Sequence, residues 1–325
     1  MADVTYKLLD FADLRGWADD DHDAALHVFL STCHDMDDPD WSNLCDFAET
    51  GQSARAFFEL FFKPVLIEDG EPMVFTGYFE PELRGALSRS DQFPHPLYRL
   101  PDEARSGAPW LTRRQIEEDA ALDGRGLEIV WIDDPVDVFF LQVQGSGRVR
   151  LPDGRMIRVG YSGKNGRDYS SVGLELVRQG IFQSHQVSAD VIRNWVRANP
   201  EDGRQLLWTN ESFVFFREVN EVPPEKGPLG AMNRSVTEMR TVAVDPAFTQ
   251  LGAPVWIEKD GADPLNRLMI AQDTGSAIKG PQRADIFFGT GDDAGFAAGR
   301  IKDGGRMIVL LPTQHALALL PAKIE

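Results

Sequence analysis

Two aspartates, Asp273 and Asp285, stand at the ends of two apolar segments toward the C-terminal end of the sequence. The run 265–271 (LNRLMIA) predicts a buried strand that leads into Asp273, and Asp285 begins a second short strand at 286–288. A carboxyl group in such a position can stay partly dry, hold its proton near neutral pH and act as a general acid. Aspartate also favours turns at strand ends, so a purely structural role is the alternative.

The neighbouring residues are of types that suit a carbohydrate site. Small residues after Asp273 would let a ligand or backbone approach closely, and a cation follows them: Gly275, Ser276, Ala277 and Lys279. The other candidate substrate-binding residues lie at predicted strand and loop ends: Thr76, Tyr78, Glu80, Gln142, Gln144, Gly145, Ser146, Lys164, Asn165 and Tyr169. Sugar hydroxyls need donors and acceptors together, which Gln and Asn supply. Cleavage of a glycosidic bond needs a protonated carboxylic acid, for which Asp285 and Asp273 are the candidates.

Other chemistries have no matching motif. The segments 145–147 (GSG) and 289–291 (GTG) match neither phosphate-loop pattern, and Ser146 lacks a GxSxG elbow. The six histidines and two cysteines show no HExxH, CxxC or Cys/His clustering. We therefore expect no cofactor and no metal.

The composition bounds the class of protein. The chain of 325 residues is long enough for two domains, and its net charge of −18 disfavours nucleic acid as a partner. Most of that charge is expected on a solvated surface.

No apolar run is long enough to span a membrane. The first residues, MADVTYKLLDFADLRGW, contain no basic region followed by an apolar core, so we expect no signal peptide in the printed sequence. A leader that had already been removed would give the same pattern.

The periodicity predicts a helical first part and a β-rich last part. Helices are expected at 20–35, 41–47, 54–62 (capped by Ser53, its aromatics in the core), 112–121 (with a Thr112/Gln115 capping box), 171–179 and 188–198. Strands are expected at 73–83, 128–132, 138–143 and 213–216, with a hairpin of 148–151 and 156–161. Short strands then follow at 241–244, 255–258, 265–271, 285–288 and 307–311, with one helical segment at 292–298. This last part favours a compact β-barrel over a doubly wound sheet.

The two cysteines, Cys33 and Cys45, are 12 residues apart on two predicted helical segments. They suit a disulfide in an oxidising compartment, and equally two free buried thiols.

Six segments, in order along the chain, carry a family resemblance. They are TGYFEPEL (76–83), FFLQVQGSGRVRLPDG (139–154), VGYSGKNGRDYSSVG (159–173), NESFVFFRE (210–218), PLGAMNRSVTEMRTVAVDP (228–246) and AQDTGSAIKGPQRADIFFGTG (271–291). Together they resemble the membrane-bound lytic transglycosylase A family of peptidoglycan-cleaving enzymes.

The resemblance implies a mainly β fold. A double-psi β-barrel would be built from both chain ends, 1–85 and 213–325, with an N-terminal helical segment. A second β-rich domain, 86–212, would be inserted and would border a groove for the glycan strand. Residues 228–325 would include the module called 3D after its three aspartates, which here match Asp245, Asp273 and Asp285. Asp245 is expected to hold a turn of the barrel.

The implied reaction cleaves the β-1,4 bond between N-acetylmuramic acid and N-acetylglucosamine. Asp285 would protonate the leaving oxygen and then accept the proton of the muramyl 6-hydroxyl as that oxygen attacks C1. The product is a 1,6-anhydromuramyl end, and Asp273 lies close by. Ordinary glycosidases instead use two carboxylates.

The chain departs from the family pattern at a few positions. Glu80 stands at a variable position and is therefore expected as a groove residue, Ser276 replaces a usual glycine, and no lipobox cysteine begins the chain. The resemblance still implies a periplasmic location, with association to the outer membrane left open, and this compartment favours the Cys33–Cys45 disulfide.

The expected partners are peptidoglycan glycan strands, with a complex of cell-wall synthesis or turnover left open and a monomer favoured. Two alternatives are a glycan-binding protein without turnover and a hydrolase of a related β-1,4 glucan.

Overall fold

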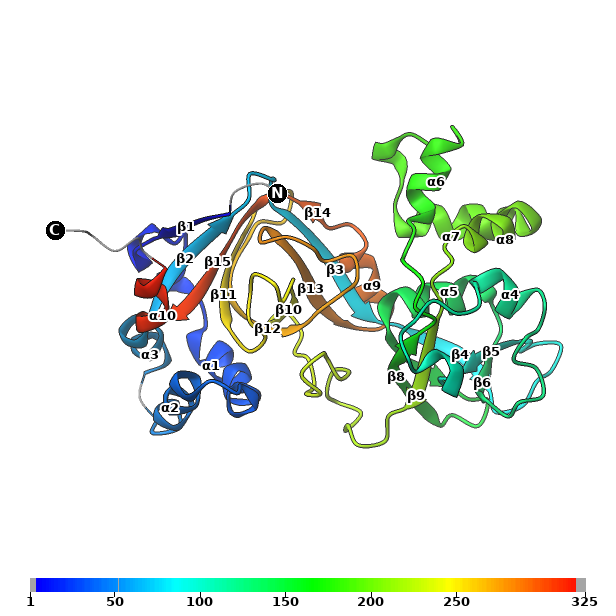
Figure 1. The fold of residues 1–325 in the computed structure, drawn as a ribbon, viewed down its shortest axis with the longest axis horizontal. Helices are drawn as coiled ribbons and strands as arrows, with labels where there is room; N and C mark the ends of the chain where they lie inside the picture. Colours follow the sequence, from blue (N-terminus) through cyan, green and yellow to red (C-terminus); the bar gives the residue numbers. More distant parts are fainter. Residues whose placement is uncertain (1–3, 52, 320–325) are drawn as a thin grey trace. The chain divides into compact units, whose positions relative to one another are not determined.

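The computed structural model describes residues 4–51 and 53–319, and backbone contacts divide the chain into two compact units (Figure 1). Unit 1 comprises Met1–Tyr78, Glu225–Gly289 and Arg300–Glu325, and unit 2 comprises Phe79–Pro224 and Thr290–Gly299. No helix within the described ranges is long and apolar enough to cross a membrane. The protein is mainly β, as predicted, with one sheet larger than the other.

The larger sheet has nine strands within the described residues, in the order β1-β2-β15-β11-β12-β10-β13-β3-β14. In chain order they are β1 (Thr5–Leu8), β2 (Phe62–Glu68), β3 (Val74–Glu80), β10 (Thr241–Ala243), β11 (Pro254–Lys259), β12 (Leu265–Asp273), β13 (Arg283–Thr290), β14 (Lys302–Asp303) and β15 (Gly305–Pro312). Strand β11 pairs antiparallel with both β12 and β15, whereas β10 runs parallel to β12 and antiparallel to β13. Strands from both ends of the chain therefore lie side by side in one sheet.

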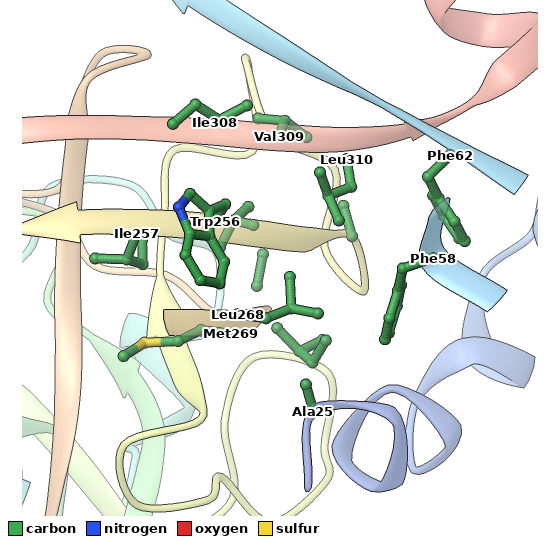
Figure 2. Close-up of a cluster of buried hydrophobic side chains, with 14 of the residues drawn as sticks. Ala25, Phe58, Phe62, Trp256, Ile257, Leu268, Met269, Ile308, Val309 and Leu310 are labelled. Atoms are coloured by element: carbon green, nitrogen blue, oxygen red, sulfur yellow. The ribbon is translucent and has the colours of Figure 1, made fainter. Parts of the chain in front are cut away.

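The core of unit 1 lies between this sheet and helices from the start of the chain. These are α1 (His22–Leu30), α2 (Pro39–Ala48) and α3 (Ala54–Phe61), with α10 (Thr313–Ala318) from the other end and the short turns η1 (Phe11–Asp13), η2 (Trp17–Asp19) and η3 (Cys33–Asp35). Figure 2 shows Trp256 of β11 among aliphatic side chains of β12 and β15, with Phe58 and Phe62 nearer α1. As predicted, Phe57, Phe58 and Phe62 are fully buried in this core, and Phe61 packs against it partly buried.

The smaller sheet belongs to unit 2 and has the order β5-β6-β4-β7-β8-β9. Its strands are β4 (Glu82–Ala86), β5 (His95–Tyr98), β6 (Glu128–Ile132), β7 (Ser146–Arg150), β8 (Met156–Lys164) and β9 (Val214–Glu218). The predicted hairpin is confirmed as the antiparallel pair of β7 and β8. Strand β4 pairs in parallel with β7, so this sheet is mixed.

Helices make up much of the rest of unit 2. They are α4 (Arg113–Glu117), α5 (Pro135–Gln144), α6 (Val172–Arg178), α7 (Ala189–Ala198), α8 (Pro200–Trp208) and α9 (Asp292–Ala298), with turns η4 (Asp102–Ala104) and η5 (Ser184–Gln186). The Thr112/Gln115 capping box opens α4, and α9 has the predicted bounds. Helix α8 was not predicted: Pro200 ends α7 but is also a good first residue for the next helix.

The predicted strand at 138–143 is wrong, because these residues belong to α5. The Asp134 side chain accepts a hydrogen bond from the Val136 N–H at 2.8 Å, and Pro135 takes the first helical position. Gly145 ends the helix with a φ of 80°. A short apolar run is compatible with either a buried strand or a buried helix, and the caps decide between them.

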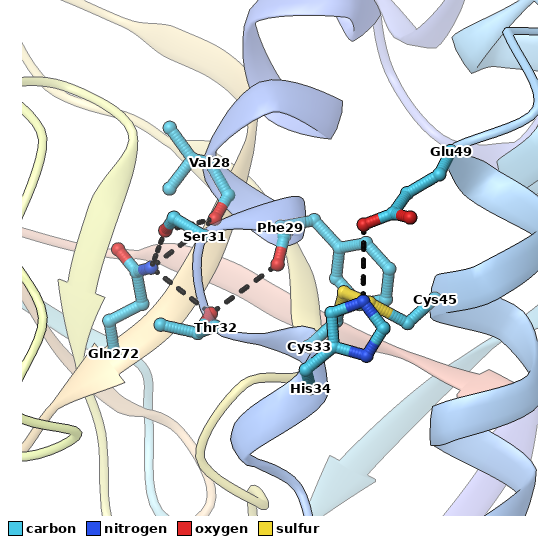
Figure 3. Close-up of a disulfide and its surroundings, with 9 residues drawn as sticks. All are labelled: Val28, Phe29, Ser31, Thr32, Cys33, His34, Cys45, Glu49 and Gln272. Carbon is cyan, nitrogen blue, oxygen red and sulfur yellow. Dashed lines mark hydrogen bonds and ion pairs between the residues drawn. A yellow bond between two sulfur atoms is a disulfide. The ribbon is translucent and has the colours of Figure 1, made fainter.

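Cys33 and Cys45 form a disulfide that joins η3 to α2, with their Cα atoms 5.6 Å apart (Figure 3). Of the two alternatives left by the sequence, the structure has the paired one. Both cysteines are fully buried beside Phe29, while His34 lies outside and contacts Glu49 at 3.1 Å. The bridge therefore links two helical segments inside the unit 1 core.

We predict that replacing both cysteines by serine lowers the free energy of unfolding by about 3 kcal/mol, because a disulfide that closes a loop of this length restricts the unfolded chain. Thermal melts with and without a reductant test this. Reductant should lower the Tm of the wild type and leave the double variant unchanged. A wild-type Tm that does not respond to full reduction would contradict the prediction.

Candidate active site

Strand β10 brings Asp273 and Asp285 next to each other. Its residue Ala243 pairs with Asp273 of β12 on one side and with Asp285 of β13 on the other. Residues in register on neighbouring strands project from the same face of a sheet, so the two carboxyl groups share one face, a single strand apart. A bulge between Val242 and Ala243 sets this register; without it, Gln272 would stand opposite Ala243.

The side chain of Gln272, which precedes Asp273 on β12, points toward the end of α1 (Figure 3). Its Nε2 donates to the hydroxyls of Ser31 and Thr32, both at 3.1 Å, at the end of α1. Its Oε1 accepts from the Thr241 hydroxyl at 2.5 Å. The residue before Asp273 is therefore fixed to the helical layer, which holds the end of β12 in place.

Asp273 accepts three hydrogen bonds. The Tyr78 hydroxyl donates to Oδ2 at 2.9 Å, and the backbone N–H groups of Ala231 and Thr274 donate to Oδ1 at 3.0 and 2.9 Å. Three donors suit a carboxylate, which only accepts when it is ionised. The three hydrogen bonds therefore favour the ionised form of Asp273.

Asp285 has a different surrounding. The Thr76 hydroxyl donates to Oδ1 at 2.5 Å, and Nη2 of Arg283 in turn donates to Thr76 Oγ1 at 2.9 Å. Oδ2 accepts no hydrogen bond from the described residues, and the residue as a whole is half-buried. One oxygen is therefore engaged, and the other is left for a proton or a ligand.

The pKa values of both aspartates are raised, but different groups oppose the rise at each of them. Burial raises the pKa of Asp273 to about 6, against the opposing effect of its three hydrogen bonds, and the nearby Asp285 adds to the rise. Burial also raises the pKa of Asp285, opposed by the Thr76 hydroxyl and by the charge of Arg283. Burial and the Asp273 charge keep the pKa of Tyr78 well above its usual value, so its hydroxyl stays a donor. Two neighbouring carboxyl groups of raised pKa can hold and transfer a proton.

Two of the predicted residues in unit 2 form a buried network. Nη2 of Arg113 donates to Gln142 Oε1 at 2.6 Å. Nδ2 of Asn165 donates to the Leu111 and Glu211 carbonyls, both at 2.8 Å. Gln142 is 6% exposed and Asn165 is fully buried, so these amides hold loops together inside the unit.

Glu80 is also buried within unit 2, although we expected it on the surface of a groove. Its Oε2 accepts hydrogen bonds from Nε of Arg148 at 2.8 Å, from Nη2 of Arg158 at 3.2 Å and from the Thr290 hydroxyl at 2.9 Å. Its Oε1 forms an ion pair with Nε of Arg158 at 2.8 Å. It is 0% exposed. These contacts tie β3 to β7, β8 and the segment before α9, which is a structural role.

The remaining predicted residues are more accessible. Gln144 accepts from the Phe79 N–H at 3.1 Å, Gly145 ends α5, and Ser146 begins β7. Lys164 ends β8, and Tyr169 is 37% exposed. After Asp273, Ser276 and Ala277 are exposed, whereas Gly275 is partly buried. Lys279 lies 3.8 Å from Asp245, whose carboxylate also accepts from the Gly280 and Ala247 N–H groups and so holds this turn.

Two contributors to the site were not among the predicted residues. Arg283 precedes Asp285 by two positions, and the period of a strand could have placed both on one face. The Ala231 N–H lies 42 residues before Asp273, and no sequence signal marks a backbone donor from so far away. Thr76, Tyr78, Asp273 and Asp285, all predicted, are brought together in unit 1.

Outside the aspartate pair, one group of side chains in the described chain has ligand atoms close enough together to hold a cation. Asp38, Asp40 and His315 bring their side-chain ligand atoms within 4.8 Å of one another, with His315 Nε2 3.0 Å from Asp40 Oδ2. In the grouping of Cys33, His34 and Cys45, both thiols are consumed by the disulfide. Neither group lies among the residues that contact Asp285.

Known protein families match this chain over two segments. Residues 74–217 match the model of the MltA specific insert domain, and residues 240–311 match the model of the 3D domain. A membrane-bound lytic murein transglycosylase A from Vibrio cholerae is 36% identical over 266 residues, which cover 77% of this chain and 70% of that protein.

Solved structures agree with this relationship. The crystal structure of a membrane-bound lytic murein transglycosylase from Agrobacterium tumefaciens is 32% identical, with a TM-score of 0.87, and covers 97% of this chain and 100% of its own. That of E. coli MltA with bound chitohexaose is 26% identical, with a TM-score of 0.75 and a coverage of 90% of each chain. The chain therefore belongs to the membrane-bound lytic murein transglycosylase A family.

We predict that Glu80→Gln destabilises the protein by about 3–5 kcal/mol, because it removes the buried carboxylate charge that pairs with Arg148 and Arg158. Urea unfolding measures this. Glu82→Gln is the matched control, since Glu82 is 33% exposed and its partner Arg150 is 56% exposed, and that pair should contribute little. Equal stabilities of the two variants would contradict the buried role of Glu80.

We predict that the change in stability caused by Asp273→Asn is more favourable at pH 7 than at pH 4. The pKa of Asp273 rises from 3.8 to about 6 on folding, so the folded state holds a proton that the unfolded chain releases. Stability therefore falls as the pH rises through this window, and the amide removes that loss. Thermal melts from pH 4 to pH 7 should show that the Tm of the variant minus that of the wild type rises with pH. A value that stays constant or falls would contradict the raised pKa.

Proposed function

We propose that this chain is a lytic transglycosylase, which cleaves the β-1,4 bond between N-acetylmuramic acid and N-acetylglucosamine in peptidoglycan and forms 1,6-anhydromuramyl ends. The observation that carries the proposal is the half-buried Asp285, with one oxygen engaged by Thr76 and the other without a partner in the described chain. Membership in the lytic murein transglycosylase A family supports it.

The first step is protonation of the leaving group. Asp285, whose pKa is raised by burial, donates the proton on Oδ2 to the glycosidic oxygen, and the bond from that oxygen to C1 of the muramyl residue breaks. Positive charge then builds up at C1. The carboxylate of Asp273, held by Tyr78 and two backbone N–H groups, stabilises that charge without having to reorganise.

The second step closes the product ring. The muramyl 6-hydroxyl attacks C1, and its proton passes to the Asp285 carboxylate, which restores the acid for the next cycle. No water is consumed, because the attacking oxygen belongs to the substrate, and its proximity replaces a high concentration of external nucleophile. A single carboxyl group therefore serves as acid and as base.

The finer features expected from the resemblance belong to this proposal. We infer that the strands of unit 1 form a double-psi β-barrel that carries the reaction, and that Lys164, Tyr169, Gln144 and the segment 145–146 in unit 2 bind glycan. The substrate implies a periplasmic location, and peptidoglycan glycan strands are the partner. The crystal structure of E. coli MltA with bound chitohexaose supports glycan binding by this family.

We predict that Asp285→Asn keeps the fold and glycan binding but lowers turnover by roughly a thousandfold, since the amide cannot donate the catalytic proton. Mass spectrometry of muropeptides released from purified peptidoglycan measures turnover, and Asp260→Asn, at a 57% exposed side chain, is the control. Anhydro ends support the transglycosylase, reducing ends would indicate a hydrolase, and no cleavage by the wild type would indicate a binding protein. Substantial turnover by Asp285→Asn would contradict the role of Asp285.

A further inference from the structure

The hydrogen bonds that reach Asp285 run in only one direction when its carboxyl group is ionised, because a carboxylate only accepts. A guanidinium group has donors and no acceptor, so the 2.9 Å contact between Arg283 Nη2 and Thr76 Oγ1 must be a donation by the arginine. A threonine hydroxyl has a single proton. With Oγ1 accepting from Arg283, that proton is directed along the 2.5 Å contact to Oδ1 of Asp285.

We propose that Arg283 is a positioning residue of the active site, which acts through Thr76 to make Oδ1 of Asp285 a permanent acceptor and so reserves Oδ2 for the transferred proton. This inference rests on the proposed function for its role in the reaction. The direction of the hydrogen bonds does not depend on that function and can be tested separately.

Arg283 is held so that it cannot turn away from Thr76. Its Nη1 donates to the backbone carbonyls of Val74 at 3.2 Å and Ala284 at 2.7 Å, one on β3 and the other on β13. The guanidinium is partly buried between these strands, and burial lowers its pKa without removing the charge. Within the described residues it makes no ion pair with Asp285, so its effect on that carboxyl passes through Thr76 and through space.

The same arrangement serves both halves of the reaction. When Asp285 is protonated, Oδ1 still accepts from Thr76, and the proton sits on Oδ2, which faces no donor of the described chain. When Asp285 is ionised, Oδ2 is the oxygen left to accept the proton of the 6-hydroxyl. The other charged or titratable groups around this pair are Asp273 and Tyr78, whose pKa values the charge of Asp285 helps to raise, and Lys302 of β14, which pairs with Thr76.

The test compares Thr76→Val, Thr76→Ser and Arg283→Gln in the full chain. We expect Thr76→Val and Arg283→Gln to lower kcat roughly tenfold or more, because the carboxyl loses its fixed orientation. Both should also move the alkaline limb of the pH profile of kcat/KM upward by about one unit, since a hydrogen bond and a charge that favour the ionised form are lost. Thr76→Ser keeps the hydroxyl, so its alkaline limb should lie at the same pH as that of the wild type.

Arg306→Gln is the matched control for the loss of a well-bonded arginine. Arg306 lies on β15 and donates to Glu258 and to the Asp13 carbonyl. Its removal should therefore lower the stability of the protein without moving the alkaline limb of the pH profile of kcat/KM. Should Arg283→Gln fail to fold, the two Thr76 variants still decide the question. A Thr76→Val profile that coincides with that of the wild type would overturn the proposal.

A second measurement separates this inference from the proposed function. ¹³C NMR of protein labelled at the aspartate carboxyl carbons, assigned with Asp285→Asn, follows the titration of Asp285 without turnover. An upward shift of that titration in Thr76→Val, absent in Thr76→Ser, supports the directed hydrogen bonds even if the wild type were to form no anhydro ends. Equal titrations in the wild type and in Thr76→Val would overturn them even if the wild type is a transglycosylase.

Discussion

The geometry of the site depends on the register of one three-residue strand. β10 lies between β12 and β13, and Ala243 is the residue that faces Asp273 on one side and Asp285 on the other. Because side chains alternate between the faces of a sheet, a slip by one residue would exchange Asp273 for Gln272. The bulge after Val242 prevents that exchange. Gln272 is fixed separately, by hydrogen bonds to the hydroxyls of Thr241 and of Ser31 at the end of α1.

Burial of two carboxyl groups at this register costs free energy, and the surrounding strands offset part of it. Tyr78 and Thr76 come from alternate positions of β3, so one strand supplies a hydroxyl donor to each aspartate. The Ala231 N–H comes from the segment before β10 and adds a further donor to Asp273. The result is an asymmetric pair: Asp273 has both oxygens engaged, whereas Asp285 keeps one oxygen available. That asymmetry is what allows one carboxyl to move a proton while the other remains an anion.

Much of the site could be predicted from the sequence, since it depends on local patterns. The apolar runs before Asp273 and after Asp285, and the strand expected at 73–83 that carries Thr76 and Tyr78, are local patterns of this kind. Glu80 of the same strand was misjudged, because only the fold shows that Arg148 and Arg158 enclose it. The helix α5 was misjudged for a related reason: six apolar residues suit both periods, and its caps at Asp134 and Gly145 carry the deciding signal. The register of β10 depends on strands that are distant in sequence, which no local pattern specifies.

The central claim is that a single carboxyl, that of Asp285, meets the scissile glycosidic oxygen through its free oxygen. A crystal structure of the Asp285→Asn variant with a bound tetrasaccharide of alternating N-acetylglucosamine and N-acetylmuramic acid tests it directly. We expect the glycosidic oxygen on C1 of a muramyl residue to lie about 3 Å from the side-chain atom that replaces Oδ2, with Thr76 still bonded to the other. A glycan bound with every glycosidic oxygen out of reach of residue 285 would contradict the mechanism.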